Sequence, residues 1–309
     1  MTTIYDLAKA PERLTGGHRL CSGCGAPICV REILANIKEP VVAITATGCL
    51  EVSTSVYPYS AWNIPWIHSA FENAPATASG IVEAYNALRR QGKISREIKF
   101  VVFGGDGSSY DIGLQSLSGA LERGHKFLYV CYNNEAYMNT GDQRSGASPL
   151  GAMTSTTPVG KISYGKNQRR KNLTEIVAAH NIPFAAQASI HLWPDIASKV
   201  QKAMAVDGPS FINILSPCQL FWGHPPNLTI KIAKLAVETG LWPLYEIENG
   251  KYKINYTPAK LLPVGDWIKS QVRFKHLLLP ENQPIVEKIQ KGVDEQWKEL
   301  KAKVEATNK

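Results

Sequence analysis

Polar side chains that can hold a metal ion or a phosphate follow two apolar runs in the middle of the chain. The first run, residues 100–103, leads into a Gly-Asp-Gly turn that contains Asp106, and the second, residues 127–132, leads into Asn133 and Asn134. Both runs have the length and the β-branched or aromatic content of strands. Asp106 offers a carboxylate oxygen and Asn134 an amide oxygen, and Mg²⁺ accepts both ligand types alongside phosphate oxygens.

The residues between the two runs predict the element that brings these side chains together. Apolar residues recur there at helical spacing, and Gly124 supplies a C-terminal stop. The unit is therefore β-α-β, and a right-handed crossover makes its two strands parallel. Asp106 and Asn134 then lie at the same edge of the sheet, where open α/β sheets bind ligands. The apolar residues at helical spacing are Ile112, Leu114, Leu117, Ala120 and Leu121.

The glycines around Asp106 favour a phosphate as the ligand. Gly105 and Gly107 allow the backbone to approach a ligand closely, and a helix starting near Ser109 would present free N–H groups to an anion. The alternative interpretation is a βαβ unit with an ordinary turn and an Asx turn at Asn133 and Asn134.

This pair of motifs resembles the thiamine diphosphate motif of thiamine-dependent enzymes. In those enzymes the aspartate and an asparagine-type side chain hold Mg²⁺ on the diphosphate. The resemblance implies that Gly105, Asp106, Gly107 and Asn134 bind the cofactor, and that Asp106 and Asn134 are ligands of Mg²⁺.

Four cysteines form a second set of residues with chemical potential. Cys21 and Cys24 form a CxxC loop, Cys49 follows a predicted strand over residues 41–46, and Cys218 follows another over residues 211–215. Because parallel strands end at one edge of the sheet, all four thiols can converge there. Four thiolates suit either Zn²⁺ or a [4Fe–4S] cluster, and the spacing does not separate these alternatives.

The two remaining cysteines of the six are expected in the core. Cys29 lies inside a helical run and Cys131 inside a predicted strand.

Composition excludes several classes of function. The 309 residues are 44% hydrophobic with a net charge of +8, no apolar run is long enough to cross a bilayer, and the first residues lack a signal-peptide core. We therefore predict a soluble, cytoplasmic protein. Its basic residues gather at 161–171 and in the C-terminal tail without interleaved aromatics, which favours docking of an acidic subunit or electron carrier over nucleic acid.

The motifs taken in order resemble the β subunit of pyruvate:ferredoxin oxidoreductase. They are CSGCG, ATGCLEVSTSVYPYSAWNIPWIHSAFENAPATASGI, GGDGSSYDIGLQSLSGALERGH, NNEAYMNTG, TTPVGK and SPC, and they extend from Gly17 to Cys218. In that family the four cysteines hold a [4Fe–4S] cluster beside thiamine diphosphate and Mg²⁺. The resemblance therefore implies that Cys21, Cys24, Cys49 and Cys218 are cluster ligands.

The same resemblance implies further site residues. His68 would hydrogen-bond near the diphosphate, and Ala136 would give its backbone carbonyl to Mg²⁺. Asn139 and Thr140 of the YMNTG motif would face the reacting part of the cofactor. Asn139 is the candidate catalytic residue, because its amide could stabilise developing oxygen charge. Cys49 would contact the cofactor as well as the cluster.

The implied activity is oxidative decarboxylation of a 2-oxo acid, most simply pyruvate, with electrons passed to ferredoxin and the acyl group to coenzyme A. Thiamine enzymes need an activating glutamate, and no glutamate here lies in an identifiable motif for it, so another subunit would supply it. Further CxxC groups are also missing, so additional clusters would belong to partner subunits.

Three alternatives remain open at this stage. Asp142 stands where we expect glycine or an apolar residue in pyruvate enzymes. An altered loop at this position could serve oxalate or a branched-chain 2-oxo acid in place of pyruvate. A non-redox thiamine decarboxylase with a structural zinc is the second alternative. The third is a basic scaffold that binds nucleic acid and keeps a decayed motif.

These observations define an α/β fold of the thiamine diphosphate-binding type, with a mostly parallel sheet flanked by helices. We expect strands at 41–46, 99–103, 127–132, 183–188 and 211–215. Residues 1–224 would form the cofactor- and cluster-binding domain. Residues 225–309 would form a C-terminal extension, with a hairpin around Asn249-Gly250, that packs on this domain or on a partner subunit.

Overall fold

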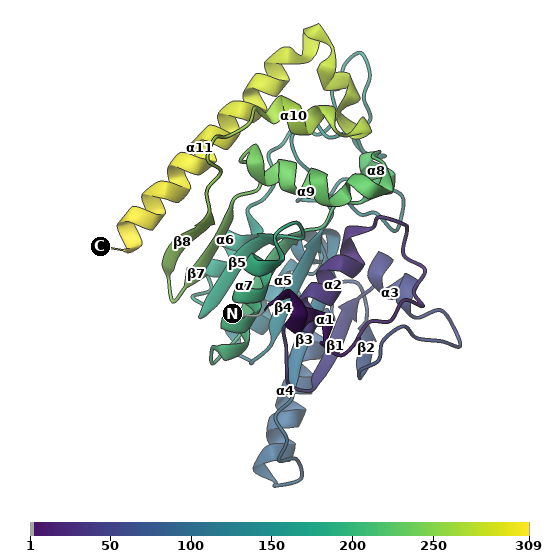
Figure 1. Ribbon diagram of the computed structural model, residues 1–309, viewed down its shortest axis with the longest axis vertical. Helices are drawn as coiled ribbons and strands as arrows, with labels where there is room; N and C mark the ends of the chain where they lie inside the picture. Colours follow the sequence, from purple (N-terminus) through teal and green to yellow (C-terminus); the bar gives the residue numbers. More distant parts are fainter. Residues whose placement is uncertain (1–2, 309) are drawn as a thin grey trace.

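The computed structural model describes residues 3–308 and has a single eight-stranded sheet at its centre (Figure 1). The strand order is β2-β1-β3-β4-β6-β5-β7-β8, in which only β7 and β8 run antiparallel to their neighbours. The predicted mostly parallel α/β fold is thus confirmed. The strands are β1 (Val41–Ala46), β2 (Trp66–Ser69), β3 (Lys99–Gly105), β4 (Leu128–Asn133), β5 (Phe184–Ser189), β6 (Ser210–Leu215), β7 (Leu244–Glu248) and β8 (Lys251–Tyr256).

All five predicted strands are present, and β3 pairs with β4 in parallel as the βαβ prediction requires. The hairpin is also confirmed, since Asn249 and Gly250 turn between β7 and β8 with positive φ. Strand β2 was not predicted, because it has four residues, of which only Ser69 is buried. It lies at one edge of the sheet and pairs with β1 alone.

Helices cover both faces of the sheet (Figure 1). On one face, α2 (Gly25–Ala35) and α7 (Trp193–Ala205) bury apolar side chains against alternate residues of the central strands. On the other face, the same is done by α4 (Ala74–Arg90), α5 (Leu114–Glu122) and α6 (Leu173–Ala178). Two short helices belong to the N-terminal half, α1 (Ile4–Ala8) and α3 (Cys49–Thr54).

The helix after Asp106 differs from the prediction. It opens with a π-helical turn, η1 (Gly107–Ile112), and becomes the α-helix α5 only at Leu114. We expected a helix to start near Ser109. π-Helical turns are rare and occur frequently at functional sites.

The C-terminal residues cover the carboxyl ends of the strands (Figure 1). Ala136 and Met138 after β4, and Leu215 at the end of β6, share a hydrophobic cluster with Trp222, Trp242, Trp267 and Trp297. Strands β7 and β8 continue the main sheet, and α11 packs along β8. The region contains α8 (Gln219–Trp222), η2 (Pro226–Leu228), α9 (Thr229–Glu238), α10 (Val264–Lys269), η3 (Val272–Leu278), η4 (Pro280–Asn282) and α11 (Gln283–Thr307).

The predicted boundary between two domains at residue 224 stays a prediction. Residues 1–2 of the first predicted domain and residue 309 of the second lie outside the described part of the chain. Residues on both sides of the division share the sheet and the hydrophobic cluster. In the part of the chain that the structure describes, no helix is both long and apolar enough to cross a membrane.

Candidate functional site

Four adjacent strands deliver the predicted site residues to one edge of the sheet. Strands β1, β3, β4 and β6 are neighbours in this order, and they are followed by Cys49, Asp106, Asn134 and Cys218 respectively. The predicted Mg²⁺-binding residues and two of the four cysteines therefore lie at the carboxyl ends of consecutive strands.

The three predicted Mg²⁺ ligands meet within hydrogen-bonding distance. Asp106 is buried, with 1% of its surface exposed. With its amide oriented to satisfy both neighbours, Asn134 Nδ2 donates to Asp106 Oδ1 at 2.8 Å and to the carbonyl oxygen of Ala136 at 2.9 Å. A carboxylate, an amide and a backbone carbonyl converge on one point, and this donor set fits a hard cation such as Mg²⁺.

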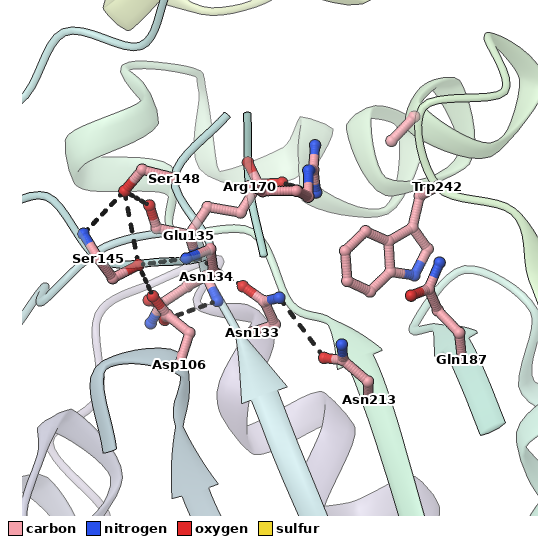
Figure 2. Close-up of polar contacts among 12 residues, drawn as sticks. Asp106, Asn133, Asn134, Glu135, Ser145, Ser148, Arg170, Gln187, Asn213 and Trp242 are labelled. Carbon is pink, nitrogen blue, oxygen red and sulfur yellow. Dashed lines mark hydrogen bonds and ion pairs between the residues drawn. The ribbon is translucent and has the colours of Figure 1, made fainter. Parts of the chain in front are cut away.

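Two further groups fix the Asp106 carboxyl group (Figure 2). Ser145 Oγ donates to Asp106 Oδ2 at 2.5 Å, and the Asn134 backbone N–H donates to Oδ1 at 3.4 Å. Burial nevertheless raises the pKa of Asp106 to about 7, because these hydrogen bonds offset only part of the desolvation. A bound cation would favour the ionised form.

The glycine turn is required by two tyrosines that cover it. A Cβ atom on Gly104 would lie 2.2 Å from Tyr129 Oη, and one on Gly107 would lie 2.6 Å from the ring of Tyr137. Tyr137 in turn donates to Asp111 Oδ2 at 3.1 Å. The backbone around Asp106 is therefore packed too tightly for any other residue at these two glycines.

A cavity of about 120 Å³ opens beside Asp106 at this edge. This is less than the roughly 300–1,000 Å³ of typical ligand pockets, so the chain would enclose only part of a cofactor of the size of thiamine diphosphate. Of the predicted cofactor residues, eight line it: Cys49, Gly105, Asp106, Gly107, Asn134, Ala136, Asn139 and Thr140.

His68 is the one predicted cofactor residue that does not line the cavity. Its Nε2 lies 2.7 Å from Thr47 Oγ1 and 3.7 Å from Glu51 Oε2, and its ring stacks on Trp66. Thr47 does line the cavity, so His68 is connected to the cavity through its contact with Thr47. Whether it reaches a bound diphosphate stays a prediction.

Six cavity-lining residues were not predicted as site residues from the sequence. Thr47 and Gly48 follow β1 directly, and their position at a strand end was a signal for them. Phe71, Tyr132 and Tyr137 carried no such signal, because aromatic residues at these positions are equally typical of a core. Met138 also lines the cavity within the YMNTG motif.

Backbone contacts hold the cysteine segments together. The Gly25 N–H donates to the Pro217 carbonyl at 3.1 Å, and a Cβ on Gly25 would lie 2.6 Å from the carbonyl carbon of Ser216. The CxxC loop and the segment before Cys218 are therefore in direct contact. Thr229 also donates to the Gly23 carbonyl at 2.5 Å, which joins α9 to the CxxC loop.

All four predicted ligand cysteines are free thiols. Burial raises the pKa of Cys24 and Cys49 to about 12. The other three thiols of the set add to the shift of Cys24, and Cys218, Cys21 and Asp106 add to that of Cys49. Burial also raises the pKa of Cys218. A cationic metal centre would favour their thiolate forms. Cys21 is exposed, whereas Cys29 and Cys131 are buried core residues as predicted.

The four thiols suit either Zn²⁺ or a [4Fe–4S] cluster. Among residues 3–308, no three or more His, Cys, Asp or Glu side chains are arranged to hold one metal ion. Zinc binds each thiolate sulfur at about 2.3 Å, which brings four sulfurs close to one another. A [4Fe–4S] cluster distributes its four thiolates over four iron atoms.

Comparison with known proteins agrees with this site. Residues 46–214 match the family described as thiamine pyrophosphate enzyme, C-terminal TPP binding domain. The fold and the site thus define a thiamine pyrophosphate enzyme.

Close relatives narrow the class. Pyruvate synthase subunit PorB of Thermotoga maritima is 54% identical over 95% of this chain and 93% of its own. PorB of Methanocaldococcus jannaschii is 50% identical over 94% of this chain and 96% of its own. Ketoisovalerate oxidoreductase subunit VorB of Pyrococcus abyssi is 43% identical over 94% of this chain and 93% of its own. The chain belongs to the 2-oxoacid:ferredoxin oxidoreductase family and, within it, to the PorB-type subunits.

A solved structure shares the fold. It is the 2-oxoglutarate:ferredoxin oxidoreductase from Magnetococcus marinus with 2-oxoglutarate, coenzyme A and succinyl-CoA bound. The match has a TM-score of 0.54 and 23% identity, and covers 73% of this chain and 78% of that one.

Proposed function

We propose that this chain is the thiamine diphosphate-binding subunit of a pyruvate:ferredoxin oxidoreductase. The observation that carries the proposal is the placement of a Mg²⁺-type donor set and two cysteines, Cys49 and Cys218, after adjacent strands of one sheet, with the CxxC loop in contact with the segment before Cys218. The net reaction converts a 2-oxo acid, coenzyme A and two oxidised ferredoxins into an acyl-CoA, CO₂, two reduced ferredoxins and a proton.

The residues around Asp106 would hold the cofactor. Asp106, Asn134 and the carbonyl of Ala136 would bind Mg²⁺, and the diphosphate would lie over Gly105 and Gly107. Thiamine diphosphate supplies a nucleophilic carbon and an electron sink for decarboxylation. Asn139 is exposed where it lines the cavity, so its amide is free to donate a hydrogen bond to a developing oxygen charge.

The four cysteines would hold a [4Fe–4S] cluster. Membership of the 2-oxoacid:ferredoxin oxidoreductase family supports a cluster over a single zinc ion. A cluster supplies a one-electron acceptor. Cys49 would bring it next to the cofactor, because this residue both lines the cavity and belongs to the cysteine set.

Partner subunits would complete the enzyme in the cytoplasm. Asp106 is the sole carboxylate among the cavity-lining residues in the described part of the chain. This supports a partner as the source of the activating glutamate. Further iron–sulfur clusters and the contact with ferredoxin would also belong to the assembled complex.

Pyruvate is favoured as the substrate, with a branched-chain 2-oxo acid as the second candidate because a VorB subunit is among the relatives. Asp142 has a φ of 65°, in the left-handed region that glycine prefers and aspartate tolerates. This backbone conformation accommodates either glycine or aspartate at position 142, and oxalate stays an alternative for the assay.

The test is an anaerobic assay of the chain assembled with its partner subunits. Viologen reduction is measured with pyruvate, 2-oxoisovalerate, 2-oxoglutarate and oxalate, each with and without coenzyme A. We expect the highest kcat/KM with pyruvate. Asp106→Ala should abolish Mg²⁺-dependent cofactor binding and leave the iron–sulfur spectrum intact. A colourless complex that contains zinc and no acid-labile sulfide would refute the redox proposal.

A further inference from the structure

Glu135 separates two of the proposed Mg²⁺ ligands and has an unusual backbone conformation. Its φ is 69°, a value that few residues other than glycine adopt. The preceding side chain, Asn134, and the following carbonyl, Ala136, both face Asp106. The carboxylate of Glu135 instead points toward Arg170 (Figure 2). The left-handed turn at Glu135 is therefore what brings the two ligands to the same side.

The Glu135 carboxylate is held by two arginines in the interior. Its Oε1 accepts from Arg170 Nη1 at 2.7 Å, and its Oε2 accepts from Arg273 Nη2 at 2.5 Å. Glu135 and Arg273 are 1% and 3% exposed. Removing one partner of a buried ion pair leaves an uncompensated charge, so this contact strongly constrains the turn.

Arg273 also supports Asn134, the residue before Glu135, through the side chain of Trp222. Its guanidinium lies 3.8 Å from the ring centroid of Trp222, and its Nε donates to Gln271 Oε1 at 2.9 Å. The indole of Trp222 donates to the backbone carbonyl of Asn134 at 2.8 Å. Arg273 and Trp222 thus fix two successive residues of the ligand segment.

The remaining polar groups of the segment are also engaged. The Glu135 N–H donates to Asn133 Oδ1 at 3.0 Å, and the Glu135 carbonyl accepts from Ser148 Oγ at 2.5 Å. The first contact is the Asx turn that the sequence suggested as the alternative to a site. It exists together with the donor set and helps to form it.

We propose that Arg273, acting through Glu135, is a positioning residue that holds Asn134 and Ala136 in the geometry for Mg²⁺. The inference rests on the proposed function, because it concerns the same metal. It assigns to η3, far along the chain, control over how tightly the cofactor is bound. Outer residues that orient metal ligands typically contribute about 10–100-fold in metal affinity.

The test measures thiamine diphosphate binding to the cofactor-depleted, assembled complex as a function of Mg²⁺ concentration. Arg273→Met should raise the Mg²⁺ concentration for half-maximal binding by about 10–100-fold. Arg273→Lys keeps the charge without the planar fork and should raise it less. Glu135→Gln should also raise it, and together with Arg273→Lys it carries the test if Arg273→Met does not fold.

Arg13→Met is the matched control. Arg13 is also a buried arginine, 8% exposed, but it donates to the carbonyls of Leu34, Lys38 and Glu39 at the C-terminal end of α2. Its loss should lower the melting temperature and leave the Mg²⁺ dependence unchanged. All variants should keep the iron–sulfur spectrum of the wild type.

Two results separate the possible failures. If the Arg273 and Glu135 variants lose thermal stability as Arg13→Met does, with no change in the Mg²⁺ dependence, Arg273 is only structural and the inference is wrong. If the wild-type complex itself binds no thiamine diphosphate in the presence of Mg²⁺, the proposed function fails instead.

Discussion

Asn134 suits its position because its amide can present a nitrogen to the site without a metal ion and an oxygen to the site with one. In the structure its nitrogen faces two oxygen atoms, Asp106 Oδ1 and the Ala136 carbonyl. A cation is bound by oxygen, so a bound Mg²⁺ would favour the opposite orientation of the amide, with Oδ1 toward the same point. An aspartate at 134 would instead place a second carboxylate against the buried Asp106, and like charges at this distance strongly disfavour ionisation. The amide avoids this repulsion while keeping an oxygen ligand for the metal.

A half-buried carboxyl group on α2, far from the metal donors in sequence, is expected to make stability depend on pH. Glu32 lies on α2 with an Oε2 atom that has no hydrogen-bond partner. Burial raises the pKa of Glu32 to about 8. Because the folded state then binds more protons than the unfolded state between its ordinary pKa and 8, stability falls as the pH rises through this window.

Glu32→Gln should therefore stabilise the chain in alkaline solution. We expect the free energy of unfolding to rise by about 2 kcal/mol or more at pH 9 and to change little at pH 4.5, since each pKa unit corresponds to about 1.4 kcal/mol. Urea denaturation of both proteins across this range measures the difference. Glu287→Gln, at an exposed position of α11, is the control and should have no effect at either pH. A pH-independent effect of Glu32→Gln would contradict the assignment.

At the scale of elements, the cysteine site depends on how closely two segments approach. Gly25 begins α2 directly after Cys24, and its missing side chain leaves room for Ser216 and Pro217. The approach brings the CxxC loop next to Cys218. Two elements that are distant in the sequence thus share one backbone contact, and the cysteine set requires it.

Gly25→Ala should separate these elements. The added Cβ would lie 2.6 Å from the carbonyl carbon of Ser216, so one segment must move away. We expect iron and acid-labile sulfide in the anaerobically purified complex to fall by about half or more, since overpacking at such a contact displaces the backbone. Thiamine diphosphate binding should change less, because Gly25 does not line the cavity.

Gly80→Ala provides the comparison for this substitution. Gly80 lies inside α4, and an added Cβ would meet no atom within 4 Å. Alanine at this site should leave the iron content unchanged and stabilise the helix by about 0.5–1 kcal/mol. If Gly25→Ala keeps its full iron content, the close approach of the two segments is not needed for the cluster.

Local patterns were sufficient for some elements and not for others. The buried parallel strands at 41–46 and 211–215 could be predicted because each is a short, mostly apolar run with a single polar residue. The π-helical turn after Asp106 could not, since it depends on Gly113, whose Cβ would lie 2.5 Å from the Ser108 carbonyl oxygen. The contact of Arg273 with Glu135 was equally hidden, because it joins residues 138 positions apart.

At the scale of the whole molecule, residues on both sides of position 224 contact the segment that carries the proposed metal ligands. Arg273 from η3 and Trp222 from α8 contact the segment after β4. The same helices bury their apolar side chains on the strand ends. A truncation at residue 224 would therefore remove a residue that holds the metal-binding segment.

The isolated chain should bind cofactors but not turn over. The cavity is small, and Asn139 and Thr140 are exposed beside it, as expected for half of a site that a partner closes. Cys21 is exposed as well, which would leave the proposed cluster close to the surface. We therefore expect no pyruvate-dependent viologen reduction by this chain alone.

Addition of the partner subunits should restore turnover, and both preparations should be assayed at equal iron and thiamine diphosphate content. Matching the cofactor content is essential, because loss of either cofactor would also abolish activity and would mimic the absence of a partner. With equal content, the difference in rate reports only the groups that the partners supply. Turnover by the isolated chain at a rate comparable to the complex would show that its own residues activate the cofactor. Glu51, a buried carboxylate 3.7 Å from His68, would then be the first residue to substitute.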